Sequence, residues 1–109
     1  MAYDEAAARR IGKVLAGSGE FTRKKMFGGI CYLVCGNMVG GLVGDTLMVR
    51  VGLEGFAEAL AQPHARPMDF TGKPLKGFVY VDPPGFATDP DLLAWLERGV
   101  AYALSLPPK

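Results

Sequence analysis

Few residues of this 109-residue sequence have the chemistry of a catalytic or metal site. His64 is the single histidine, and it lies in a proline-rich stretch. A histidine that catalyses or binds a metal needs a partner, which can be another histidine, a cysteine or a carboxylate. No such partner lies near His64 in the sequence. We therefore expect His64 to be a solvent-exposed loop residue.

The two cysteines, Cys31 and Cys35, lie four residues apart, which matches no C-x₂-C metal pattern. Four residues of a strand extend over about 13 Å, whereas a disulfide tolerates a Cα separation of only about 6 Å. Unless the chain turns sharply between them, we expect both to be small buried hydrophobic residues in a reducing compartment.

Glycine pairs and hydroxyl groups also fail to form a recognisable catalytic motif. Gly28-Gly29 and Gly40-Gly41 fit neither the P-loop nor the dinucleotide pattern, so they predict bulges, a strong twist or close backbone approach. Ser18 and Ser105 lack a basic partner. The sequence thus predicts a protein that is not an enzyme, with no catalytic, metal-binding or cofactor-binding residues.

Basic residues are the strongest remaining signal. Residues 1–25 hold six bases against three acids, although the formal net charge of the chain is only +1 and its pI is about 7.8. The densest run, Arg23-Lys24-Lys25, fits either a solvated strand start that discourages edge pairing or a contact for an anion or an acidic partner. The candidate contact residues are Arg23, Lys24, Lys25, Lys73 and Lys76. The near-neutral pI argues against strong DNA binding.

Hydrophobic spacing predicts the elements that position these residues. Helical spacing of apolar residues runs from residue 3 to 15, and again over residues 52–61 and from about residue 89 to 104. In the last helix, Thr88 or Asp89 is the expected N-cap, and Trp95 and Gly99 belong to the face that packs on the sheet. Strands are expected over residues 24–34, 38–43, 46–51 and 78–81, with a long connection over residues 62–77 that contains a short strand near 68–70.

The expected order α-βββ-α-ββ-α indicates an α+β fold, in which a two-layer domain has an antiparallel sheet covered by helices. The length predicts a single domain over residues 1–109. No apolar run approaches the roughly 20 residues that span a bilayer, and the acidic N-terminus is unlike a signal peptide. These features predict a cytoplasmic protein with no membrane contact.

Several motifs, taken in order, resemble the N-terminal domain of the TfoX/Sxy family. They are Lys25-Met26-Phe27-Gly28-Gly29, Tyr32, Gly36-Asn37-Met38, Leu47-Met48-Val49-Arg50-Val51, Lys76-Gly77-Phe78-Val79-Tyr80-Val81 and Ser105-Leu106-Pro107. The resemblance implies a bacterial cytoplasmic protein with a two-layer α+β fold. Full-length members regulate competence genes, act with a DNA-bound transcription factor and carry a C-terminal domain. This chain is expected to be the stand-alone N-terminal domain.

Three functions remain open at this stage. The first is a non-enzymatic interaction module in transcription regulation, which binds a protein partner or forms a homodimer. The second is a nucleic-acid-binding domain whose contact is weak or indirect. The third is a small-molecule-binding protein, or an enzyme, with a pocket between the sheet and the helices.

Overall fold

The order of elements follows the alternation of helices and strands that the sequence predicts. The computed structural model describes residues 3–17, 19–26, 29–70 and 73–107, without the side chains of residues 26, 69–70 and 73–76. Its elements are α1 (Glu5–Ala16), β1 (Thr22–Met26), β2 (Gly29–Val34), β3 (Asn37–Val43), β4 (Thr46–Arg50), α2 (Gly52–Leu60), β5 (Ala65–Phe70), β6 (Lys73–Val81), the 3-10 helix η1 (Pro83–Phe86) and α3 (Asp89–Ser105).

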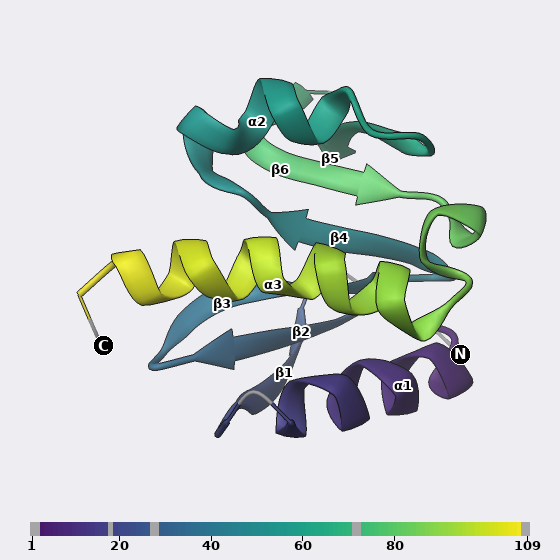
Figure 1. Ribbon diagram of the computed structural model, residues 1–109, viewed down its shortest axis with the longest axis vertical. Coiled ribbons are helices and arrows are strands. Elements are labelled where there is room, and N and C mark those ends of the chain that lie inside the picture. The colour runs from purple at the N-terminus through teal and green to yellow at the C-terminus, as the bar shows by residue number, and fades with distance from the viewer. Residues whose placement is uncertain (1–2, 18, 27–28, 71–72, 108–109) are drawn as a thin grey trace.

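The strands form one antiparallel sheet in the order β1-β2-β3-β4-β6-β5. Helix α3 crosses the middle of the sheet, while α1 lies toward the β1 end and α2 toward the β5 end (Figure 1). This arrangement confirms the α+β class with an antiparallel sheet covered by helices. Because β1 and β5 are the two outer strands, each is paired on one side only.

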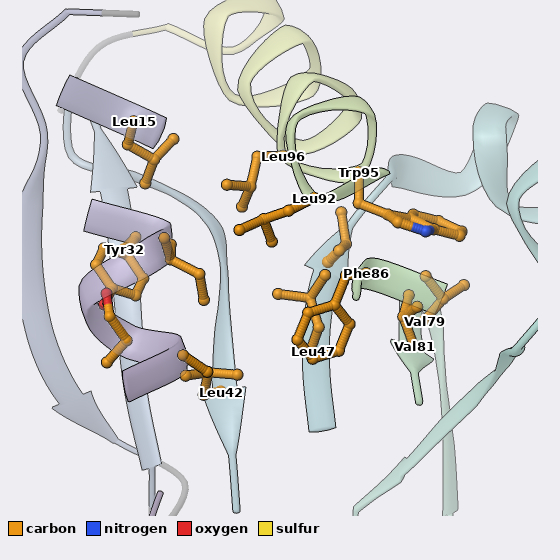
Figure 2. Packing of buried hydrophobic residues seen from close by; sticks show 14 of the residues in the cluster. Leu15, Tyr32, Leu42, Leu47, Val79, Val81, Phe86, Leu92, Trp95 and Leu96 are labelled. Carbon is orange, nitrogen blue, oxygen red and sulfur yellow. The ribbon is translucent and has the colours of Figure 1, made fainter. Parts of the chain in front are cut away.

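The main core lies between the sheet and the helices, and it receives every second side chain of the strands because successive side chains point to opposite faces. Leu47 of β4 belongs to this core, together with Leu92, Trp95 and Leu96 of α3 (Figure 2). Val49 of β4 belongs to the same core. A second, smaller cluster of buried residues comes from alternate strand positions, namely Cys31, Met48, Met68 and Tyr80. Both faces of the sheet therefore bury apolar side chains.

The predicted roles of Trp95 and Gly99 in α3 are confirmed. Trp95 is only 6% exposed and belongs to the main core. A Cβ atom at Gly99 would overlap the carbonyl oxygen of Val39 and lie 2.8 Å from its Cγ1 atom. Glycine at this position lets the backbone of α3 approach β3 closely.

Side-chain caps determine where two of the helices begin. The Asp4 carboxylate accepts hydrogen bonds from the backbone N–H groups of Ala6 and Ala7, at 2.9 and 3.2 Å, and so caps α1. The Thr88 hydroxyl accepts a hydrogen bond from the N–H of Asp91 at 3.3 Å and caps α3. The structure thus selects Thr88, rather than Asp89, as the cap of the last helix.

Two segments differ in detail from the prediction. The run over residues 24–34, expected as one strand, covers the end of β1 and all of β2, which pair from Thr22 opposite Leu33 to Met26 opposite Gly29. The expected long connection over residues 62–77 is instead largely a hairpin of β5 and β6. Proline and lysine within this hairpin weaken its alternating apolar pattern, which is why the pattern alone suggested a loop.

The expectation of close backbone approach at the paired glycines is confirmed where the structure describes them. A Cβ atom at Gly41 would overlap the carbonyl oxygen of Ile30 in the neighbouring strand. A β-bulge or irregularity also interrupts the β2–β3 register between Tyr32 and Leu33. Gly28 lies outside the described residues.

Candidate functional site

The densest basic run of the sequence forms an outer strand of the sheet. Arg23, Lys24 and Lys25 occupy the middle of β1, and all three are exposed. Among the described strands, β1 pairs only with β2, so its other edge is open. The run therefore combines positive charge with an unpaired strand edge.

The pairing register distributes these bases over both faces of the sheet. Lys25 is opposite Ile30 and Arg23 is opposite Tyr32, and both partners belong to the core beneath the helices. Lys24 is opposite Cys31, which belongs to the cluster on the other face. Residues directly opposite each other in a sheet point to the same face. Arg23 and Lys25 therefore lie on the face that the helices cover, and Lys24 lies on the other face.

The charge of this strand is not compensated by ion pairs among the described residues. Three other arginines each lie within 4 Å of a carboxylate: Arg10–Asp89 at 3.2 Å, Arg66–Asp82 at 3.1 Å and Arg98–Glu58 at 3.4 Å. Arg23, Lys24 and Lys25 take part in none of these pairs. The outer strand thus keeps its positive charge available for an external group.

Lys73 and Lys76, the other candidate contact residues, belong to β6 and not to a loop. Their side chains lie outside the described ones. In the sheet order, β6 is four positions from β1, which corresponds to about 19 Å at the usual strand spacing. The topology therefore places the two groups of bases on different parts of the sheet.

A cleft between the start of α2 and the end of α3 is a second feature that could receive a ligand. Its volume is about 600 Å³, and it is lined by Val51, Gly52, Leu53, Glu54, Gly55, Arg98, Ala101, Tyr102 and Ser105. The side chain of Val51, the N-cap residue of α2, makes no capping hydrogen bond to the first turn of this helix. Leu53, which is 71% exposed, adds an apolar surface at the rim.

Sequence reasoning missed this cleft because packing between two distant segments creates it. Gly52 has a φ of 79°, and a Cβ atom there would collide with the ring of Tyr102. Close to this contact, the Arg50 guanidinium lies over the rings of Phe78 and Tyr102, 5.7 and 5.1 Å from their centroids. A glycine at a helix start was the one available signal, and it indicates only that space is limited.

Two buried side chains of β2, the strand next to β1, have raised pKa values. Burial raises the pKa of the Cys31 thiol to about 11. Burial also raises the pKa of Tyr32, and the positive charge of Arg23 lowers it in part. The Tyr32 hydroxyl donates a hydrogen bond of 2.9 Å to the carbonyl oxygen of Ala8, which joins β2 to α1. Both groups are therefore neutral at physiological pH and stabilise the fold.

The histidine and the two cysteines, whose side chains could support catalysis, lie in different elements of the fold. His64 is exposed at a φ of 68°, as predicted. Cys31 is buried as predicted, but the same prediction for Cys35 is wrong, because Cys35 is exposed in the β2–β3 turn at a φ of 53°. Within the described ranges, no group of three or more His, Cys, Asp or Glu residues could hold a metal ion.

Membrane insertion through a helix has no basis in the described part of the chain. The helices found there lack the length and apolar content that crossing a bilayer requires.

The fold and the surface define a small α+β domain with an open, basic sheet edge. The chain matches the family model of the TfoX N-terminal domain over residues 13–103. It therefore belongs to the TfoX N-terminal domain family, as its motifs suggested. None of the curated proteins and none of the solved structures compared with it matches.

Proposed function

We propose that this TfoX N-terminal domain is a non-enzymatic regulatory module that binds a protein partner or self-associates. The observation that carries the proposal is the outer strand β1, whose three exposed bases are free of ion pairs among the described residues. Family membership supports a part in transcription regulation in the bacterial cytoplasm, because the resemblance is to regulators of competence genes.

The chemistry of the cysteine and histidine side chains supports a role that is not enzymatic. A nucleophilic cysteine acts as the thiolate, which a lowered pKa favours. Cys31 has the opposite property, since burial raises its pKa to about 11. His64 is exposed in the turn before β5, where its backbone carbonyl accepts a hydrogen bond from Asp82 N–H at 3.0 Å. These residues suit a structural role better than proton or acyl transfer.

Strong nucleic-acid binding is disfavoured by the separation of the bases. Three bases on β1 would contact about three phosphates, which corresponds to a salt slope of about −3 and to weak binding at physiological salt. Lys73 and Lys76 belong to a different strand of the sheet, β6. A direct contact with DNA would therefore be weak, or would depend on a protein already bound there.

The α2–α3 cleft supports a second candidate function, which is binding of a small molecule. Its lining combines the Tyr102 ring, the Arg98 guanidinium and the first turn of α2. A ligand in this cleft would raise the melting temperature of the wild-type domain in a screen of small anions and aromatic acids. Loss of that increase in Tyr102→Ala would support the cleft as its site, and a screen without any increase would argue against it.

The main proposal can be tested by capture from a bacterial lysate together with sedimentation of the purified domain. We expect either a protein that is retained reproducibly or a dimer that forms with increasing concentration. A domain that remains monomeric and retains no protein would contradict the proposal. Turnover of a substrate by the purified domain would contradict its non-enzymatic part.

A further inference from the structure

The open edge of β1 presents main-chain groups as well as charge. β1 pairs with β2 through five consecutive residue pairs, from Thr22 to Met26. In an antiparallel pair, alternate residues of an outer strand direct both N–H and C=O away from their partner. This edge can therefore accept a further strand, as sheets that bind extended peptides do.

A second copy of the chain is a poor occupant of this edge. Antiparallel pairing of two β1 strands about Lys24 would place Lys24 opposite Lys24 and Arg23 opposite Lys25. Like charges directly opposite each other destabilise strand pairing. The three bases thus oppose self-pairing at β1, while they attract a segment of opposite charge.

We propose that β1 receives an extended acidic segment of a partner protein as an additional strand of the sheet. This inference rests on the proposed function and gives the chemistry of the partner. Side chains of an added strand alternate between the faces of the sheet. A run of three acidic residues would place two carboxylates beside Arg23 and Lys25 on the helix-covered face and one beside Lys24 on the other face.

An acidic peptide fits this edge better than a nucleic acid does. Phosphate oxygens accept hydrogen bonds but cannot donate them to the outward carbonyl groups of β1. An extended peptide supplies both N–H donors and C=O acceptors at the spacing of a strand. The bases could bind either ligand, whereas the outward N–H and C=O groups of β1 can all form hydrogen bonds only with the peptide.

The probe is a short capped peptide with three consecutive glutamates flanked by threonine and valine. Two further peptides carry N-methyl groups on one or the other set of alternate residues, which removes N–H donors and leaves the charge unchanged. Titration of ¹⁵N-labelled protein at low and at physiological salt reports both the dissociation constant and the amides affected. A labelled DNA duplex of arbitrary sequence is titrated under the same conditions.

The key variant is Arg23→Glu/Lys25→Glu, and its matched control is Arg9→Glu/Lys13→Glu. Arg9 and Lys13 are exposed on the face of α1 opposite its buried residues, and neither takes part in an ion pair among the described residues. Both variants lower the formal net charge equally. A melting curve for each variant verifies that it folds. If Arg23→Glu/Lys25→Glu does not fold, Lys24→Glu serves as a milder variant.

We expect amide shifts concentrated in β1 and β2, and a loss of affinity of about tenfold or more in Arg23→Glu/Lys25→Glu, because attraction becomes repulsion at two sites. Arg9→Glu/Lys13→Glu should change affinity by less than about twofold, since its charges lie away from the edge. One set of N-methyl groups should weaken binding by about tenfold, and the other set should have little effect.

Equal binding of all three peptides would overturn strand addition, because it would show that charge alone holds the peptide. Strand addition would also be overturned if both charge variants lost affinity equally or if the acidic peptide did not bind. Tighter binding of the duplex than of the peptide would overturn it as well, and would show that a nucleic acid is the better ligand. Strand addition at β1 can also fail while the broader proposal of an interaction module holds. If the Arg23→Glu/Lys25→Glu variant still captures the lysate partner, the domain is an interaction module that uses another surface.

Discussion

Replacing Gly99 with alanine tests the close packing of α3 on the sheet. Helix propensity alone predicts that glycine to alanine in a helix interior stabilises the protein by about 0.8 to 1 kcal/mol. At Gly99 the new Cβ atom would overlap the carbonyl oxygen of Val39 and lie 2.8 Å from Val39 Cγ1. A backbone oxygen cannot rotate away, so α3 would have to move outward from β3.

The expected magnitude follows from these two opposing contributions. Overpacking of a well-packed core costs about 1 to 3 kcal/mol, which exceeds the gain from helix propensity. Gly99→Ala should therefore lower the free energy of unfolding by about 1 kcal/mol on balance. In a domain of this size, that corresponds to a melting temperature lower by about 4 °C or more.

Gly12→Ala in α1 is the matched control. Among the described residues outside its own helix, a Cβ atom at Gly12 would meet only the Phe21 ring, at an ordinary contact distance of 3.8 Å. This variant should be more stable than wild type by up to about 1 kcal/mol. Because helix propensity contributes equally to both variants, the difference between them measures the overpacking alone.

Urea denaturation followed by circular dichroism, with the two variants measured side by side, supplies these free energies. Equal stabilisation by Gly99→Ala and Gly12→Ala would refute the packing argument, because it would show that α3 does not approach β3 as closely as the structure indicates. A difference of about 1 to 3 kcal/mol between the variants would confirm it.

Three further predictions concern other buried side chains. Trp95→Ala should lower the free energy of unfolding by about 3 to 5 kcal/mol, because it empties an aromatic site of the core, and an unchanged urea midpoint would contradict that role. Asn37→Ala should cost about 1 to 3 kcal/mol, because the buried Nδ2 donates to the carbonyl oxygens of Pro107 and Ala103 at 3.0 and 3.5 Å; a calorimetric melt identical to wild type would show these bonds to be dispensable. Burial raises the pKa of Cys31 from 9.0 to about 11, so the folded state holds this proton more tightly, and the associated stability is complete below pH 9 and is lost as pH rises toward 11. Over that range the free energy of unfolding of Cys31→Ala should decline less than that of wild type, by at most about 3 kcal/mol, and equal declines in urea denaturation would refute the effect.

Local patterns in the sequence determined much of the secondary structure. The apolar stripe of α3, its Thr88 cap and the apolar run of β4 follow from local residue patterns and capping, which depend on neighbouring residues. The family assignment also followed from the sequence, because motifs of the family occur in order along the chain and the family model matches residues 13–103. The hairpin of β5 and β6 was less visible, since cross-strand pairing stabilises it more than its own residue preferences do.

The position of each candidate residue relative to the others was decided only by the tertiary structure. The sequence identified Arg23, Lys24 and Lys25 as a basic run, but only the strand order places them on an open edge and separates them from Lys73 and Lys76. The cleft beside Tyr102 likewise depends on how α2 and α3 pack. Contacts between residues far apart in the chain arise from the packing of whole elements, and no local pattern encodes them.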